Sequence, residues 1–302
     1  MKVYCIVVTY NGINWLERCL GSLRKSRYPV NVIIVDNSST DGSVDYIKQH
    51  FPEILLIEAS ANLGFGQANN IGLKKTLECN ADFVLLLNQD AWIKEDTINK
   101  LVEATQGNPE YGIVSPFHLD ASEQQLEQLF AELFDRYNNS IITDLYFNRL
   151  KYIYETGYVH AACWFMSRSC IETVGGFDPI YFHYGEDDDY LQRAKYFNFK
   201  IGLVPHAQVI HDSTYNLWEK VQWNENRNMV IALQQLKNMP SHFRTNVLLF
   251  FKTGFDELTS LLLYRKFKKF RFRLTIFLKT IFKLGKIHKS YQASFRKKAF
   301  LS

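Results

Sequence analysis

The feature that most constrains the fold of this chain is the alternation of apolar, strand-like runs with helical patterns over its first 115 residues. The runs are nearly continuous in apolar residues, as in strands buried on both faces, and they lie at 3–10, 30–36, 54–59 and 82–88. Segments of helical length and spacing separate them, at 14–26, 41–51 and 66–80. Strand–helix alternation at this spacing predicts an α/β fold with a mostly parallel sheet flanked by helices.

The chain changes character after residue 117. Residues 118–157 are acidic and rich in Gln, then aromatic, and we expect them to form an insertion or lid over the sheet edge. Further strands are expected at 162–167 and 200–211, with a turn signal at 175–179 between them.

Charge divides the chain into an acidic body, expected at 1–240, and a basic helical extension, expected at 241–302. Residues 243–302 hold fifteen Lys and Arg against two acidic residues, a local charge of +13 in a chain of +4, so the other 242 residues carry −9. Large apolar residues recur in the extension every three to four positions, at Phe267, Phe270, Leu274, Phe277, Leu278 and Ile281. Such a basic amphipathic helix favours contact with an anionic membrane surface. The alternative is a helix packed on the body with its lysines in solvent.

Composition excludes several classes of protein. With 47% hydrophobic residues and ordinary charge, the chain is neither disordered nor collagen-like. Its five cysteines form no CxxC and no zinc-ligand spacing, so we expect reduced thiols and a cytoplasmic location. We expect no signal peptide, and no uncharged apolar stretch reaches the roughly 18 residues needed to cross a membrane.

Four consecutive acids, Glu186 to Asp189, precede a helix-like run. Carboxylates are favourable in the first turn of a helix, which explains one or two of them. Like charges this close raise one another's pKa values, so the cluster also suits a general base that takes a proton from a hydroxyl.

Polar residues also follow the predicted strands. Thr9, Tyr10 and Asn11 end the first strand, and Asp36 ends the second. These are common turn and helix-cap residues, but at the carboxyl edge of a parallel sheet they can also bind a base or a ribose.

A glycine loop follows the third predicted strand. Asn62 and Gly64 lie in it, and Asn69 follows in the next helical segment. The loop suits an anion at a helix N-terminus, although it is not GxGxxG and lacks a Walker lysine.

The fourth and last predicted strands end in potential metal ligands. Asn88 and Asp90 close the fourth strand, and His211 closes the last. A carboxylate and an imidazole at the same sheet edge could hold Mg²⁺ or Mn²⁺ against a diphosphate. Each is also an ordinary strand-end residue when taken alone.

In combination, these segments resemble a known family. VVTYNG, VDNSSTDGS, NLGFGQANN, LLLNQD, VGGFDP, YGEDDDY and the later His211 occur in the order found in family 2 glycosyltransferases with the Rossmann-like GT-A fold. The resemblance covers roughly residues 3–235 and is closest to the rhamnosyltransferase-like branch, which also includes galactofuranosyl transferases.

The resemblance implies a role for each candidate residue. Thr9, Tyr10 and Asp36 would hold the nucleotide, with Asn11 and Gly64 beside them, and Asn62 and Asn69 would line the nucleotide-sugar pocket. Asp90 and His211 would bind Mn²⁺ or Mg²⁺, and Asp187, preceded by Glu186, would be the catalytic base of an inverting transfer. Arg227 matches a further substrate-binding position.

One position departs from the family's DxD metal motif. Asn88 replaces its first Asp, which places the metal on Asp90, His211 and the donor diphosphate. Relatives carry Asn there too, so the resemblance does not imply inactivity.

The expected function is therefore metal-dependent transfer of a sugar from a nucleotide-diphosphate donor to a hydroxyl of a glycan or lipid-linked acceptor, in bacterial cell-surface polysaccharide synthesis. The expected donor is dTDP-rhamnose, with a UDP-hexose or UDP-galactofuranose as the alternative. The expected location is cytoplasmic, peripheral at the inner face of the plasma membrane.

Two other interpretations are a non-catalytic sugar-nucleotide-binding protein and a nucleic-acid binder acting through the basic tail. No nucleic-acid motif accompanies that tail, so nucleic acid is not an expected partner.

Overall fold

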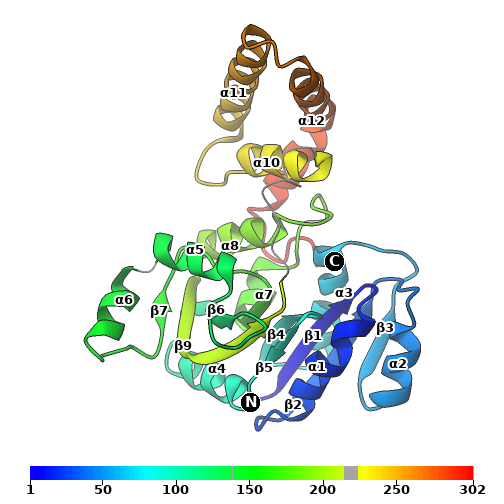
Figure 1. Ribbon diagram of the computed structural model, residues 1–302, viewed down its shortest axis with the longest axis vertical. Coiled ribbons are helices and arrows are strands. Elements are labelled where there is room, and N and C mark those ends of the chain that lie inside the picture. The colour runs from blue at the N-terminus through cyan, green and yellow to red at the C-terminus, as the bar shows by residue number, and fades with distance from the viewer. Residues whose placement is uncertain (138, 214–223, 302) are drawn as a thin grey trace.

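The computed structural model describes residues 1–137, 139–213 and 224–301, which fold into an α/β body and a bundle of helices projecting from it (Figure 1). The strands are β1 (Val3–Thr9), β2 (Val30–Asp36), β3 (Leu55–Glu58), β4 (Phe83–Asn88), β5 (Ala91–Ile93), β6 (Tyr111–Leu119), β7 (Tyr154–Glu155), β8 (Cys163–Ser167) and β9 (Lys200–His211). The helices of the body are α1 (Ile13–Arg24), α2 (Ser43–His50), α3 (Phe65–Glu78), α4 (Thr97–Gln106), α5 (Gln128–Tyr137), α6 (Asn139–Tyr146), α7 (Arg168–Val174) and α8 (Glu186–Tyr196). The helices of the bundle are α10 (Glu225–Leu236), α11 (Phe243–Leu263) and α12 (Phe267–Ala293).

All nine of these strands belong to one sheet, in the order β3-β2-β1-β4-β8-β6-β9-β5, with β7 also paired to β9. Strands β3, β2, β1 and β4 are mutually parallel, and the α/β prediction is confirmed there. The other half of the sheet is mixed, because β8 runs antiparallel between β4 and β6 while β9 runs parallel to β6. Residues 118–157 contribute α5, α6 and the short strand β7 on β9.

The core lies on both faces of the sheet, as continuous apolar strands require. Alternate residues of β1 point to opposite faces: Val3, Cys5 and Val7 pack with α1, α2 and α4, whereas Tyr4 and Ile6 pack with α3, α7 and α8. The cysteines are free, and burial raises the pKa of the Cys5 thiol well above its ordinary value. These thiols therefore behave as small core residues.

The basic extension packs against α10 around a separate apolar core. Of the predicted stripe on α12, Phe270, Leu274, Phe277 and Ile281 lie in this core, beside residues of α10 and α11. Phe267 and Leu278 are exposed instead, with 60% and 45% of their surfaces accessible. The packed-helix interpretation thus describes most of the stripe. Within the described residues, the helices are all too short or too polar to cross a membrane.

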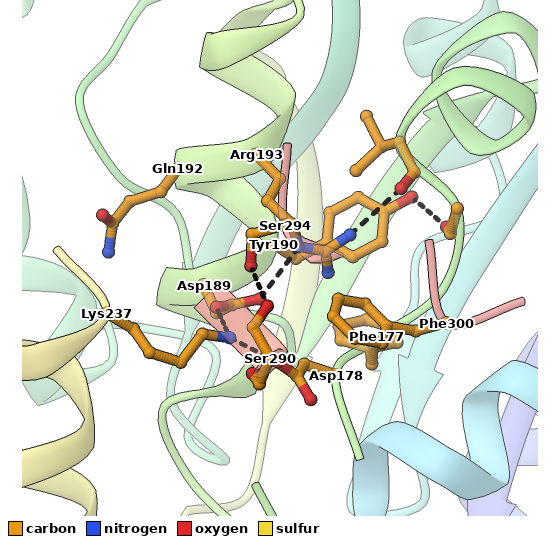
Figure 2. Close-up of polar contacts among 12 residues, drawn as sticks. Phe177, Asp178, Asp189, Tyr190, Gln192, Arg193, Lys237, Ser290, Ser294 and Phe300 are labelled. Atoms are coloured by element: carbon orange, nitrogen blue, oxygen red, sulfur yellow. Dashed lines mark hydrogen bonds and ion pairs between the residues drawn. The ribbon is translucent and has the colours of Figure 1, made fainter. Parts of the chain in front are cut away.

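A buried polar cluster joins the bundle to the body (Figure 2). Lys237, just after α10, is 1% exposed and forms ion pairs with both Asp178 and Asp189. Arg193 also pairs with Asp189 at 2.9 Å, and Ser290 of α12 donates to Asp178. Helix α8 is therefore fixed to the bundle through charges that have no contact with solvent.

The C-terminal segment adds a second attachment between distant parts of the chain. The Asn70 side chain in α3 accepts from the Phe177 amide at 2.7 Å and donates to the Phe177 and Phe300 carbonyls at 2.8 and 3.1 Å. The turn at 175–179 and the C-terminal segment that contains Phe300 are thus both held against α3.

Removing the cation of the buried cluster should destabilise the protein strongly. We expect Lys237→Ala to lower the free energy of unfolding by about 3–5 kcal/mol, because it leaves two buried carboxylates with one cation. Lys279→Ala is the matched control, since its ion pair with Glu225 is about half exposed, and it should cost less than about 1 kcal/mol. Urea unfolding followed by circular dichroism measures both, and equal losses would contradict this role of Lys237.

Candidate functional site

The first candidate residues meet at the carboxyl ends of neighbouring strands. In the register of the sheet, Thr9 lies opposite Asp36, and Val8 lies opposite Asn88. The polar ends of β1, β2 and β4 therefore form one edge, as expected for parallel strands.

The end of β1 is fixed by a residue that sequence reasoning assigned no role. The Gln89 side-chain oxygen accepts from the Thr9 hydroxyl at 2.8 Å and from the Tyr10 amide at 2.9 Å. Thr9 is fully buried, whereas the Tyr10 side chain is 46% exposed. Thr9 consequently supports the loop, and Tyr10 offers an accessible aromatic ring.

Asp36 is a buried carboxylate with one oxygen left over. It is 2% exposed, and its Oδ2 accepts from the amides of Ser38 and Ser39 at 3.1 and 3.0 Å. Its Oδ1 is buried and has no partner among the described residues. A buried acceptor without a donor is unfavourable, so this oxygen is suited to a ligand N–H or O–H.

The loops beside Asp36 brace one another. Asn11 accepts from the Thr40 amide at 2.8 Å, and Asn62 accepts from the side chain of Asn37 and the amide of Gly64, both at 2.9 Å. Gly64 has a φ of +81°, and a Cβ there would lie 2.0 Å from the Phe182 carbonyl oxygen. The loop after β3 thus touches the segment that leads into α8.

Asn69 lies deeper than its neighbours in the glycine loop. It is 1% exposed, and its side-chain NH₂ donates to the Phe65 carbonyl within α3 at 3.0 Å. In this arrangement its amide group stabilises the start of α3.

The potential metal ligands Asp90 and His211 are brought together by strand pairing. Ala91 lies opposite His211, and the Asp90 Oδ1 is 3.5 Å from the His211 Nε2. Asn88, at the end of β4, has a buried Oδ1 with no partner among the described residues.

Two buried residues of the 118–157 region also lie beside His211, and the sequence patterns did not predict them. The His211 Nδ1 is 3.9 Å from a Glu127 oxygen, and the ligand atoms of His118, Glu127 and His211 lie within 4.8 Å of one another. Burial disfavours a charged His211, but the carboxylates of Asp90, Glu127 and Asp212 outweigh it and raise its pKa. Burial holds the pKa of His118 well below its ordinary value, so His118 is neutral.

The four acids of α8 have different surroundings. Burial raises the pKa of Asp189, but the charges of Lys237 and Arg193 outweigh it, so the net shift is downward. Asp188 accepts from Gln192 at 3.1 Å, and burial followed by the Asp187 charge raises its pKa. Asp189 is therefore a structural ion-pair partner, and Asp188 is held on its own helix.

Glu186 and Asp187 are the acids that remain. Burial, helped by the Asp187 charge, raises the pKa of Glu186 to about 8, and its Oε2 has no partner among the described residues. Asp187 is partly exposed; it accepts from the Tyr158 hydroxyl and, at 2.8 Å, from the Asp188 amide. Glu186 is therefore protonated at neutral pH, and Asp187 beside it is held in position by its two hydrogen bonds.

The charges of both the acidic helix and the potential metal-ligand region act on His160, which is half-buried. Burial lowers the pKa of His160, while the charges of Asp187 and Glu127 both act to raise it. The His160 ring lies 5.5 Å from the Tyr158 ring, centroid to centroid. Through Tyr158, which donates to Asp187, His160 is adjacent to the acidic helix.

Arg227 is placed beside the segment that precedes α8. Its guanidinium lies 4.0 Å from the centroid of the Tyr184 ring, from the first turn of α10. A cation is thus available next to the loop that leads into α8, the helix that carries Asp187.

Solved structures with the same architecture are glycosyltransferases of the GT-A fold, which confirms the predicted fold class. One is a mannosyltransferase from Pyrobaculum calidifontis in complex with GDP-Man and Mn²⁺, which has a TM-score of 0.58 and 16% identity over 94% of this chain and 86% of that one. At that identity the likeness shows the fold alone.

The model of the family described as glycosyl transferase family 2 matches residues 4–175, and the chain belongs to this family. It is 30% identical to an N-acetylglucosaminyl-diphospho-decaprenol L-rhamnosyltransferase of Mycobacterium tuberculosis, over 70% of this chain and 76% of that protein. It is 22% identical to a dTDP-rhamnosyl transferase of Shigella flexneri, over 70% and 69% of the two chains. These relatives confirm the predicted resemblance to the rhamnosyltransferase-like branch.

Proposed function

We propose that this glycosyltransferase is a metal-dependent inverting enzyme that transfers rhamnose from dTDP-rhamnose to a hydroxyl of a glycan or lipid-linked acceptor. The proposal is supported by Asp36 and the Asp90–His211 pair at the strand ends of one sheet, and by the hydrogen bond from Tyr158, whose ring lies 5.5 Å from that of His160, to Asp187. Two relatives named as rhamnosyltransferases support the donor. A UDP-hexose or UDP-galactofuranose is the alternative donor for the same fold.

On the donor side, we assign the nucleotide to the ends of β1 and β2. The unpartnered Asp36 Oδ1 would accept from the base or ribose, and the exposed Tyr10 ring would lie against the base. We retain Asn11, Asn62, Gly64 and Asn69 as residues that shape this pocket. The hydrogen bonds of these four residues suit them to hold the loops in position rather than to read the sugar.

The chemistry of the strand ends fits a divalent cation. A carboxylate oxygen and an imidazole nitrogen 3.5 Å apart can converge on one ion with modest adjustment; the carboxylate suits Mn²⁺ and Mg²⁺ alike, and the imidazole favours Mn²⁺ of the two. When bound, such an ion would neutralise the charge that develops on the leaving diphosphate. The buried Asn88 oxygen could be a further ligand of such an ion, and the Arg227 guanidinium could pair with the diphosphate.

We assign the proton transfer to Asp187. The acceptor oxygen forms a bond to the anomeric carbon while the bond from that carbon to the diphosphate oxygen breaks, and the hydroxyl proton passes to Asp187. The Tyr158 hydroxyl holds one carboxylate oxygen, which orients the base. Attack from the side opposite to the leaving group inverts the anomeric centre and needs no covalent intermediate.

The name of the mycobacterial relative includes a diphospho-decaprenol acceptor. On that basis we propose a lipid-linked acceptor, cell-surface polysaccharide synthesis and a cytoplasmic, peripheral location at the inner face of the plasma membrane. We further propose that 1–240 is the catalytic domain and that the basic extension, 241–302, serves membrane attachment.

Replacing the proposed base should stop transfer without stopping donor binding. We expect Asp187→Asn to lower turnover at least about a hundredfold, because the general base acts on the acceptor proton. Asp188→Asn is the matched control, and its turnover should stay within a few-fold of wild type. Transfer of rhamnose from dTDP-rhamnose measures turnover, and calorimetry with dTDP measures binding. An active Asp187→Asn with an inactive Asp188→Asn would assign the base to the wrong acid.

Activity should depend on a divalent cation held by the strand ends. We expect EDTA to abolish transfer and Mn²⁺ to restore it, since the diphosphate leaves with its charge uncompensated otherwise. Asp90→Ala and His211→Ala should each weaken Mn²⁺-dependent binding of dTDP at least about tenfold, by calorimetry. Full activity of metal-free protein would refute the metal assignment.

A further inference from the structure

Helices α11 and α12 form a hairpin, and within residues 1–137, 139–213 and 224–301 one of its faces is covered by another helix. Helix α10 lies against that face, where Thr280 contacts Met229, Lys279 pairs with Glu225 and Thr253 bonds to Gln235. The apolar core described above fills the space between the three helices. The hairpin extends away from the sheet (Figure 1).

The opposite face of the hairpin carries large apolar side chains that are left exposed by the elements the structure describes. On α11, Leu248, Phe255 and Leu262 follow one another at seven residues, which is two helical turns, and they are 71%, 57% and 46% exposed. On α12, Phe267, Leu278 and Phe282 lie close to a single line, at intervals of about three turns and one turn, and are 60%, 45% and 88% exposed.

These two lines of side chains lie on the same side of the hairpin. The Phe255 ring of α11 is 5.4 Å from the ring of Phe277 on α12, whose next residue is Leu278. On each helix the lines are turned away from the positions that contact α10, such as Thr253 and Thr280. We name this surface, made of the six apolar residues, the outer face.

Basic residues share the outer face with the apolar ones. Arg244 lies four residues before Leu248, Arg271 lies four residues after Phe267, and Lys289 lies seven residues after Phe282; all three are exposed. No acidic residue follows Glu257 in the chain. The surface therefore combines apolar area with positive charge, as helices that lie in a membrane interface do.

We propose that the outer face docks on an anionic lipid surface, with the hairpin lying along the membrane. Its apolar side chains enter the headgroup boundary, and Arg244, Arg271 and Lys289 contact lipid phosphates. This deepens the proposed function, because it rests on a lipid-linked acceptor and names the surface that reaches it. The buried Lys237 cluster holds α8 against the bundle, so docking also sets the position of Asp187 relative to the lipid.

A second copy of the chain is the competing occupant. Two outer faces packed together would bury apolar area, but they would also bring six exposed cations together with no acid on either face. Like charges placed across an interface oppose association. Charge complementarity therefore favours anionic lipid.

Vesicle sedimentation of the full chain tests the proposal. We expect binding to phosphatidylcholine vesicles containing about one third phosphatidylglycerol, and little binding to phosphatidylcholine alone. The variant Leu248→Ser, Phe255→Ser, Phe282→Ser should bind at least about tenfold more weakly. The control variant Leu145→Ser, Ile231→Ser, Leu249→Ser removes exposed apolar residues from other surfaces and should bind as wild type.

Charge reversal tests the second component of the surface. Arg244→Glu, Arg271→Glu, Lys289→Glu should abolish binding to the anionic vesicles, whereas Lys25→Glu, Lys74→Glu, Lys297→Glu, with the same change in net charge, should weaken it far less. Equal losses in the two charge variants, or wild-type binding by the outer-face serine variant, would overturn the proposal.

Two further readouts separate the possible failures. Hydrolysis of dTDP-rhamnose in solution should be unchanged in all four variants. If wild type itself does not hydrolyse dTDP-rhamnose, the proposed donor is wrong, but vesicle binding still tests the outer face independently. Sedimentation velocity should give the same oligomeric state for wild type and the outer-face serine variant. Dissociation of a wild-type oligomer by that variant, with vesicle binding retained, would assign the face to a second copy and contradict lipid docking.

Discussion

The position and rotation of the acidic helix α8 depend on the buried ion pairs of Asp189. This carboxylate is balanced by Arg193 from its own helix and by Lys237 from the bundle, and all three side chains are almost fully buried. Charges out of water stabilise a structure only when every partner is present, so the cluster permits little rotation of α8. Asp187 lies two residues earlier, on the other side of the helix, and the same constraint turns it towards Tyr158.

The fixed helix also explains how four adjacent acids coexist. Asp189 is neutralised by cations, Asp188 is held by amides, and Glu186 is buried with a pKa raised to about 8, which leaves it protonated at neutral pH. Asp187 and Asp188 are both partly exposed, but Asp187 is oriented by the Tyr158 hydroxyl, whereas Asp188 accepts from Gln192 of its own helix and burial raises its pKa. Environment rather than residue type therefore separates the proposed base from its neighbours, as in other sites that use paired carboxylates.

Local periodicity in the sequence was enough to predict the strands that end at or near Asp36, Asp90 and His211. The antiparallel insertion of β8 was not predictable, because no local pattern specifies the direction of a strand within a sheet. The contributions of Tyr158, Glu127 and His118 were missed for a related reason: they come from the 118–160 region, whose partners lie far away in the chain. Helical spacing on α12 predicted an apolar stripe correctly but could not tell whether α10 or lipid would cover it.

The anomeric configuration of the product distinguishes inversion from retention, since a single base acting opposite the diphosphate can give only one outcome. After transfer from dTDP-rhamnose to a soluble acceptor analogue, nuclear magnetic resonance of the new glycosidic bond reports its configuration. We expect a configuration opposite to that of the donor, both in wild type and in any product that the Asp187→Asn variant still forms. A product with the donor's configuration would contradict this expectation, because retention needs a second nucleophile or attack from the face of the leaving group.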